Sequence, residues 1–216
     1  MICPLCGGAA DGYHRSRGRD FFLCPLCRYI FVPACQHLPP DEERKRYLEH
    51  ENSLENEGYV RMFETKLDLL VRHGPAGGTV LDFGCGYEPV LKTLLERRGF
   101  EARVYDRFFF PEWQPGRRYD AVISTETFEH LRAPVLEIDR ILQTLKPGGY
   151  LAIMTRFYPE KGGEPDPAGF ANWYYTNDPT HIGFFGSRTL DWIARTRQLE
   201  IVYRDGHDFI IYQTSS

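Results

Sequence analysis

Apolar residues recur along this chain with two different periods, and the alternation of these periods predicts its architecture. From about residue 76, short apolar runs alternate with segments whose apolar residues are three and four apart, as on one helix face. The predicted strands are residues 79–83, 102–106, 119–124, 150–155, 199–203 and 208–212. Helices are predicted over about 88–98, from Pro134 to about 145, and from Ser187, which suits an N-cap.

Such strand–helix alternation predicts an α/β fold, with helices on both faces of a mostly parallel sheet. The last two predicted strands lie close together in the sequence and are expected to pair antiparallel.

Two regions with other patterns precede this domain. Residues 1–38 are rich in Cys, Gly and Pro, with short β-type runs at 21–23 and 29–32. Residues 41–73 are strongly charged and are predicted to be helical, with one apolar stripe formed by Tyr59, Phe63, Leu67 and Leu70. Gly74-Pro75 ends that helix, because proline cannot continue it. The predicted division is therefore 1–38, a helical linker at 39–75, and a main domain at 76–216.

The composition indicates an ordinary soluble globular protein. The 216 residues are 42% hydrophobic and 26% charged, and the formal net charge is −4, so no chain-wide field favours nucleic acid. No apolar run approaches the roughly 18 residues of a membrane span. The first residues lack the basic and apolar stretches of a secretory signal. A cytoplasmic protein without membrane contact is the expectation.

Four of the six cysteines form two nearly identical pairs, Cys3-Pro4-Leu5-Cys6 and Cys24-Pro25-Leu26-Cys27. Two such turns can offer four thiolates to one tetrahedral ion, and their separation is typical of a zinc site. A segment as short as 1–38 has too small a core to fold alone, so a metal would supply folding energy. We therefore predict a structural zinc knuckle or ribbon with these four cysteines as ligands.

A glycine-containing loop joins the first strand of the main domain to its first helix. The segment Leu81-Asp82-Phe83-Gly84-Cys85-Gly86 lies at the carboxyl end of that strand, where open α/β sheets bind ligands. Glycine lets the backbone approach a ligand closely. Asp106 ends the next strand, the place of a ribose-binding acid in dinucleotide folds. The loop lacks the third glycine of G-x-G-x-x-G, which argues against NAD.

Together with residues 119–124, Glu129-His130-Leu131 and residues 142–151, this loop resembles the ordered motifs of class I S-adenosylmethionine (SAM)-dependent methyltransferases. The resemblance covers residues 79–155 and implies a Rossmann-like seven-stranded sheet with the last strand antiparallel. Only about a dozen residues separate Asp106 from Tyr119, so the third strand is expected to be short or missing.

The resemblance also implies a set of cofactor-binding residues. Gly84 and Gly86 would line the methionine moiety, and Asp106 would bind the ribose hydroxyls. The whole implied set is Asp82, Phe83, Gly84, Cys85, Gly86, Asp106, Arg107, Thr125 and Glu126.

Methyl transfer also needs an acceptor pocket and, for a protonated nucleophile, a base. The aromatic stretch 156–186 follows a strand where this family often has substrate-contacting insertions, and Trp173, Tyr174 and Tyr175 are candidate contacts. His181 and His130 are candidate bases, since histidine can accept a proton near neutral pH. Ordinary packing is the alternative for all five residues.

Three functions fit these patterns. The leading one is a SAM-dependent methyltransferase acting on oxygen, nitrogen or carbon of a small or medium-sized molecule. The second is an RNA methyltransferase guided by the zinc module, whose Arg15, Arg17, Arg19 and Arg28 make it mildly basic. The third is a partner-binding protein that has the SAM-type fold without catalysis.

Overall fold

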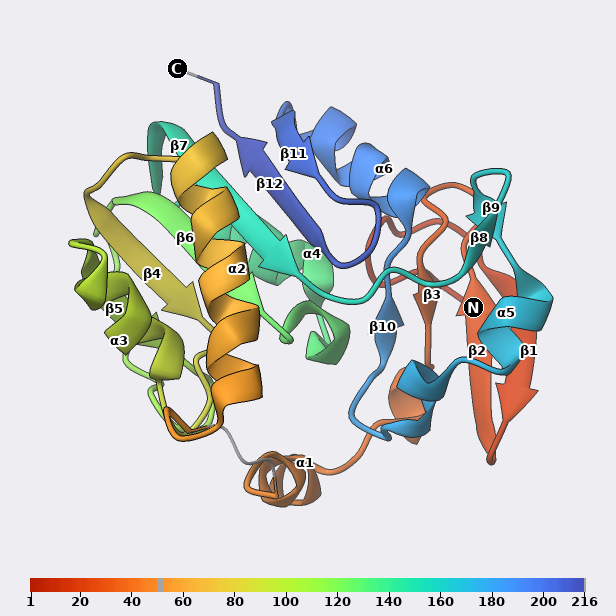
Figure 1. Cartoon of the computed structure of the whole chain (residues 1–216). Coiled ribbons are helices and arrows are strands. Elements are labelled where there is room, and N and C mark those ends of the chain that lie inside the picture. Colours follow the sequence, from red (N-terminus) through yellow and green to blue (C-terminus); the bar gives the residue numbers. More distant parts are fainter. Residues whose placement is uncertain (50–52, 216) are drawn as a thin grey trace.

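The central feature of the protein is a six-stranded sheet, seen here in a computed structural model that describes residues 1–49 and 53–215 (Figure 1). Its order is β11-β12-β7-β6-β4-β5, with β5, β4, β6 and β7 parallel and β12 antiparallel to both its neighbours. The strands are β4 (Thr79–Phe83), β5 (Glu101–Tyr105), β6 (Tyr119–Thr125), β7 (Leu145–Met154), β11 (Glu200–Arg204) and β12 (Phe209–Gln213). The α/β prediction and the antiparallel final pair are confirmed.

The expected third strand is missing rather than short. Directly after β5, Asp106 and Phe110 exchange two backbone hydrogen bonds of 3.0 Å, so the chain turns back at once. The few residues before β6 cannot also form a helix and return along the sheet. Among the described residues the central sheet therefore ends at β5 and has six strands in place of seven.

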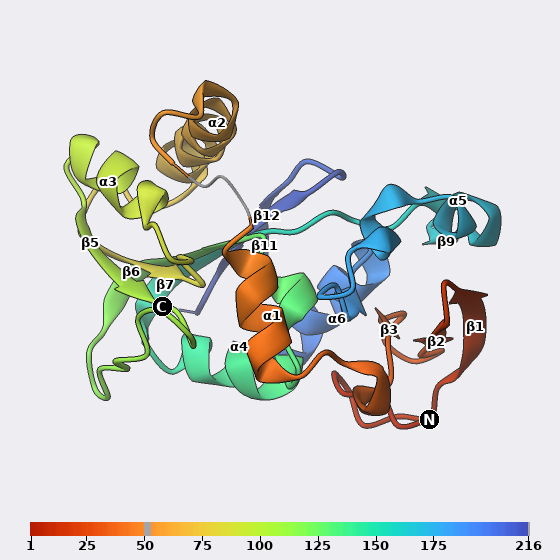
Figure 2. The same ribbon diagram turned by 90° about the horizontal axis from the view of Figure 1, so that it is seen from below.

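Helices cover both faces of the sheet, as Figure 2 shows. α2 (Glu57–His73) and α3 (Val90–Arg97) pack on one face through residues such as Leu67 and Leu94. α4 (Pro134–Leu142) and α6 (Ser187–Arg197) pack on the other. The prediction of Ser187 as N-cap is wrong by one residue: it is the first helical residue, and its N–H donates to Glu160 Oε1 at 2.9 Å.

The charged region 41–73 forms two helices, which corrects the prediction of one. α1 (Pro40–Tyr47) lies near the carboxyl ends of the parallel strands, and α2 follows after a break (Figure 1). Asn56 Oδ1 accepts a hydrogen bond from the N–H of Tyr59 at 3.1 Å, so a side-chain cap starts a new helix there. The predicted apolar stripe is otherwise present, with Phe63, Leu67 and Leu70 buried.

The N-terminal region and the aromatic insertion share one small sheet, in the order β1-β2-β3-β10. Its strands are β1 (Asp11–Ser16), β2 (Arg19–Leu23), β3 (Ile30–Phe31) and β10 (Gly183–Phe184). The insertion also contains β8 (Glu160–Lys161), β9 (Glu164–Pro165) and α5 (Pro167–Ala171). Short 3-10 helices occur at Ala34–Gln36, Phe128–His130 and Tyr174–Asn177.

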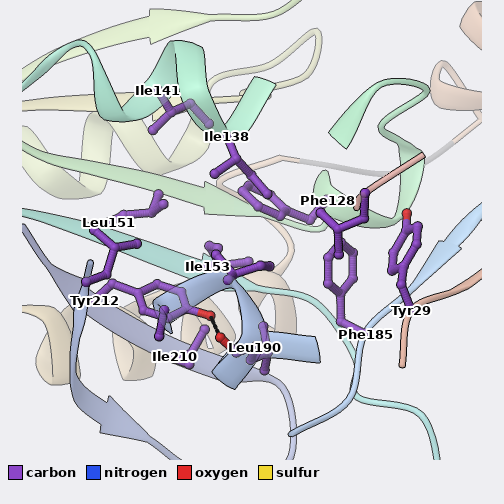
Figure 3. Packing of buried hydrophobic residues seen from close by; sticks show 14 of the residues in the cluster. Tyr29, Phe128, Ile138, Ile141, Leu151, Ile153, Phe185, Leu190, Ile210 and Tyr212 are labelled. Atoms are coloured by element: carbon purple, nitrogen blue, oxygen red, sulfur yellow. Dashed lines mark hydrogen bonds between the residues drawn. The ribbon is translucent and has the colours of Figure 1, made fainter. Parts of the chain in front are cut away.

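A continuous core joins this small sheet to the main domain (Figure 3). The ring of Phe185 lies 4.9 Å from that of Tyr29 and 5.9 Å from that of Phe128, linking insertion, N-terminal region and main domain. Nearby, the Tyr212 hydroxyl donates to the carbonyl of Leu190 at 3.1 Å. No helix in the described part of the chain is long and apolar enough to cross a membrane.

Candidate active site

A cavity of about 880 Å³ opens at the carboxyl ends of β4, β5 and β6. One part of its wall comes from the strand ends and the loops that follow them, the other from α1, the Phe128–His130 turn and the insertion. We call the part around Asp82, Gly84, Gly86 and Asp106 the cofactor end. The part around Glu126, His130, Tyr175 and His181 is the acceptor end.

The glycine loop of the cofactor end needs glycine at Gly84. Its φ of +83° is in the left-handed region, and a Cβ there would lie 2.1 Å from Thr127 Oγ1. The N–H of Gly84 donates to the carbonyl of Tyr105 at 2.7 Å, which ties the loop to the end of β5. Glycine at this position therefore lets the Thr127 side chain pack directly against the loop backbone.

Asp106 closes the same loop from the neighbouring strand. Its Oδ2 accepts from the N–H of Gly86 at 3.2 Å, and its Oδ1 accepts from the N–H groups of Phe108 and Phe109 at 2.8 and 3.1 Å. These bonds hold the carboxylate at the cavity wall in a fixed orientation. An oxygen acceptor held in this way can bind hydroxyl groups of a ligand.

Asp82 is the most unusual group of the cofactor end. It lines the cavity yet is only 1% exposed, and neither carboxylate oxygen has a hydrogen-bond partner in the described structure. Burial, reinforced by the charge of Asp106, raises the pKa of Asp82 to about 8. An unpaired buried carboxylate is costly, so this position favours a cationic or hydrogen-bond-donating ligand.

The other predicted cofactor-binding residues also line the cavity: Phe83, Cys85, Arg107, Thr125 and Glu126. The Arg107 guanidinium stacks 4.6 Å from the ring centre of Phe108. Burial raises the pKa of the Cys85 thiol, which keeps it protonated at neutral pH. The whole predicted set therefore shares one cavity.

At the acceptor end, a tyrosine bridges two acids, of which Glu129 is buried and Glu126 is exposed. The Tyr175 hydroxyl lies 2.5 Å from Glu129 Oε1, to which it donates, and 3.4 Å from Glu126 Oε2. Glu126 has a φ of 50°, which is strained for a residue with a side chain. Although the residue as a whole is exposed, desolvation of its carboxyl, together with the charge of Glu129, raises the pKa of Glu126 to about 8.

Both candidate histidines lie here, side by side. His130 Nδ1 is 2.9 Å from the carbonyl oxygen of Thr180, and His181 Nδ1 is 2.7 Å from that of Tyr175. Their ring centres are 4.9 Å apart. Burial, with a smaller effect of the neighbouring His130, lowers the pKa of His181 to about 4. His181 is therefore a neutral imidazole at physiological pH.

The three aromatic candidates for substrate contact have different environments. Tyr175 is buried and lines the cavity, and Tyr174 lines it while remaining 61% exposed. Trp173 is not among the lining residues and packs on the insertion's aromatic core, its ring 6.0 Å from those of Phe170 and Phe184.

Several cavity residues carry no signal in the sequence. Glu43 and Tyr47 come from α1, where Glu43 accepts from Arg132 at 2.6 Å and from the Tyr47 hydroxyl at 2.9 Å. Arg156 and Asp208 reach the cavity from the ends of β7 and β12. The charged pattern of this region predicted only a helix, so it is the tertiary structure that places Glu43 at the cavity.

The four predicted metal ligands form a second cluster, in the N-terminal region. The Sγ atoms of Cys3 and Cys27 are 3.6 Å apart and those of Cys6 and Cys24 are 3.4 Å apart, and all four lie within 4.8 Å of one another. A disulfide needs about 2.05 Å. Sulfurs that share one tetrahedral ion at about 2.3 Å would be separated by roughly 3.8 Å, so the cluster fits zinc.

The methyltransferase domain family matches residues 54–204, and the chain belongs to this family. It is a class I SAM-dependent methyltransferase with a Rossmann-like fold. No curated protein matches the sequence.

Solved structures of the same fold include three of bacterial and archaeal methyltransferases. The 1,6-didemethyltoxoflavin-N1-methyltransferase of Burkholderia thailandensis, solved with its substrate and S-adenosylhomocysteine (SAH), is 14% identical, with 96% of this chain and 100% of that chain covered and a TM-score of 0.55. A putative SAM-dependent methyltransferase of Methanococcus maripaludis is 15% identical, with coverages of 80% and 94% and a TM-score of 0.54. The N-methyltransferase NodS of Bradyrhizobium japonicum is 14% identical, with coverages of 81% and 98% and a TM-score of 0.52.

Proposed function

We propose that this protein methylates a small or medium-sized molecule, with SAM at the cofactor end of the cavity and the methyl acceptor at the acceptor end. The observation that carries the proposal is that one cavity of about 880 Å³ contains two groups of residues: a glycine loop with two acids, and a separate cluster of tyrosine and histidine side chains. That volume lies in the upper part of the range for small-molecule sites, about 300–1,000 Å³, which suits two ligands.

The residues of the cofactor end fit SAM by their chemistry. Gly84 and Gly86 leave room for the methionine part, and Asp106 offers its carboxylate to the ribose hydroxyls. The unpartnered carboxylate of Asp82 suits the ammonium group, directly or through a water. Bound SAM supplies an electrophilic methyl group, and the chain's own task is to hold the acceptor in line with it.

At the acceptor end, His130 and His181 act on the reacting group of the acceptor. Because each Nδ1 is next to a backbone carbonyl, it carries the proton, and each Nε2 therefore presents a lone pair. Tyr174 and Tyr175 form the aromatic wall, and Glu43 with Arg132 borders the opening. Trp173 supports this wall from behind rather than touching the acceptor.

The N-terminal region binds zinc through Cys3, Cys6, Cys24 and Cys27 in a purely structural role. A closed set of four thiolates leaves no open coordination position for chemistry. Thiols kept for a metal also fit a reducing compartment, which supports a cytoplasmic location.

The contacts of the module's arginines do not favour RNA as the acceptor. Arg19 donates to three carbonyls of the insertion, and Arg28 pairs with Glu164. Arg15 lies 3.4 Å from Asp20. Arg15 and Arg17 are exposed, but phosphate contacts by Arg19 and Arg28 would need those two side chains to be free. A small-molecule acceptor is therefore the better proposal.

Isothermal titration of zinc-replete protein with SAM tests the cofactor end. We expect micromolar binding that Asp106→Ala weakens at least about 100-fold, a loss of roughly 2.7 kcal/mol. Asp191→Ala, which removes an acid on α6 outside the cavity, is the matched control and should bind normally. Absence of SAM binding by the folded wild type would refute the proposal.

A further inference from the structure

Three side chains at the acceptor end converge as metal ligands would. One atom each of Glu129, His130 and His181 lies within 4.8 Å of the other two. They come from the Phe128–His130 turn and from the insertion, so the fold brings together two distant segments. The cysteine cluster has no part in this grouping.

The two imidazoles are oriented as metal-binding histidines are. Each Nδ1 donates to a backbone carbonyl, of Thr180 for His130 and of Tyr175 for His181. Ligating histidines almost always donate their other N–H to such an acceptor, which fixes both tautomer and ring. Within the described residues neither Nε2 makes a hydrogen bond, and both rings line the cavity.

The carboxylate is fixed in the same manner. Glu129 is 0% exposed; its Oε1 accepts from Tyr175 at 2.5 Å and its Oε2 from Thr155 at 2.8 Å. No lysine or arginine contact to this buried acid is found in the described structure. Hydrogen-bonded carboxylates of this type are common ligands in metal sites, where the ion balances their charge.

The spacing suits an ion better than a direct contact. His130 Nε2 lies 3.9 Å from Glu129 Oε1, too far for a hydrogen bond. Two ligands of one tetrahedral ion, each bonded at about 2.1 Å, are separated by roughly 3.4 Å. The three ligand atoms lie within 4.8 Å of one another, so the most distant pair closes by at most about 1.4 Å when the ion binds.

We propose that Glu129, His130 and His181 bind one divalent transition-metal ion, such as Zn²⁺, that holds a hydroxyl-bearing acceptor. Two imidazoles with one carboxylate form a ligand set that leaves coordination positions open. The open positions face the cavity, because both histidines line it. Metal binding itself does not depend on the proposed function. Only the role of the ion in holding a methyl acceptor rests on that proposal.

With an ion bound, the two histidines act as its ligands and not as bases that accept the acceptor's proton. A hydroxyl bound to a divalent ion loses its proton to water more easily, because the ion stabilises the oxyanion. That oxygen then bonds to the methyl carbon as the sulfur–carbon bond of SAM breaks, and SAH leaves. The acceptor class assigned is therefore an alcohol or phenol.

Zinc binding to the protein without SAM or acceptor tests the site. Zinc-replete protein is dialysed, so that the cysteine cluster keeps its ion, and is then titrated with Zn²⁺ by calorimetry, with total zinc measured by mass spectrometry. We expect one further saturable Zn²⁺-binding event in the wild type. Its affinity should fall at least tenfold in His181→Ala and in Glu129→Gln. His73→Ala should retain it, since His73 stacks on Tyr203 and does not line the cavity.

Titration of the same samples with SAH separates this proposal from the previous one. Normal SAH binding in all variants shows that they fold and that the cofactor end is intact. No second zinc event in the wild type, or one that persists in both variants, overturns the metal site even if SAH binds. In that case the cluster contacts the acceptor directly.

Discussion

The two ends of the cavity are built in different ways. At the cofactor end, the contacts are mostly backbone groups and acids at the ends of adjacent parallel strands, as in the bonds from Gly84 to Tyr105 and from Gly86 to Asp106. At the acceptor end, side chains arrive from α1, the Phe128–His130 turn and the insertion. The predicted cofactor site is therefore part of the fold, whereas the proposed acceptor site is assembled from segments added to it.

The N-terminal region holds the acceptor end in place. β3 pairs with β10, and the Tyr29 hydroxyl occupies the space in which a side chain at Gly183 would lie. Arg19 donates to the carbonyls of Thr176 at 3.1 Å, of Asp178 at 2.8 Å and of His181. We therefore expect zinc at the cysteine cluster to stabilise the small sheet that carries β10 of the insertion.

Loss of the cysteine cluster should affect the two ends most unequally. In Cys24→Ser, or after removal of zinc by a chelator, we expect methyl transfer to fall at least about 100-fold, because structural zinc contributes on the order of 10 kcal/mol to the folding of such modules. SAH affinity should change by less than about threefold, since the described hydrogen bonds of Gly84, Gly86 and Asp106 tie the cofactor end to β5 and the loop after it. Calorimetry and a methyl-transfer assay measure the two effects.

Cys35→Ser is the matched control for that variant, because Cys35 is exposed and outside the cluster. It should retain both activities. An equal loss of SAH binding and of turnover in Cys24→Ser would mean that the two ends are not independent.

Arg19→Ala should give a smaller effect in the same direction. Three carbonyls of the insertion lose their donor, at a cost of about 1–3 kcal/mol, and the backbone around His181 loses its support. We expect kcat to fall about tenfold, with SAH affinity unchanged. Arg15→Ala is the control, since that side chain is 76% exposed. If Arg19→Lys restored full kcat, a single charge rather than the shared geometry of three bonds would be what matters.

The cofactor end could be predicted from the sequence because its determinants are local. A strand, two glycines and an acid after the next strand occur in order, so Gly84, Gly86 and Asp106 could be assigned before the fold was known. The cysteine pairs are equally local. The short segment between Asp106 and Tyr119 even indicated the absent third strand.

The acceptor end could be predicted only in part. His130, His181 and Tyr175 were candidates by residue type, but their meeting depends on the path of the insertion, which no periodicity encodes. Glu43 and Tyr47 lie on a helix whose pattern indicated only solvent exposure. The break between α1 and α2 also escaped prediction, because the charged residues on both sides favour helix equally.

The smallest expected difference between the two ends is in the pH dependence of SAM binding, which we expect Asp82 to control. Its pKa of about 8 belongs to the ligand-free protein, where burial and the charge of Asp106 disfavour the carboxylate; Tyr59 and Cys85 also lie close enough to interact with it. A cationic ligand favours the ionised form and lowers that pKa. SAM affinity should therefore rise as pH increases from about 6.5 to 8.5, by about tenfold, and level off above the pKa.

The same carboxyl should affect stability in the opposite direction. Because its pKa in the folded protein is raised above 3.8, the usual value for an aspartate, its contribution to stability is fully present below pH 3.8 and is lost as pH rises through about 8. The Tm of the ligand-free protein should therefore fall between pH 5 and 8.5, and Asp82→Asn should flatten both this fall and the rise in SAM affinity. Glu112→Gln, a change in an exposed acid outside the cavity, should leave both profiles as in the wild type. If Asp82→Asn kept the wild-type pH profile of SAM affinity, Asp82 would not face the cofactor's positive charge, and the ammonium group would have to lie elsewhere in the cofactor end.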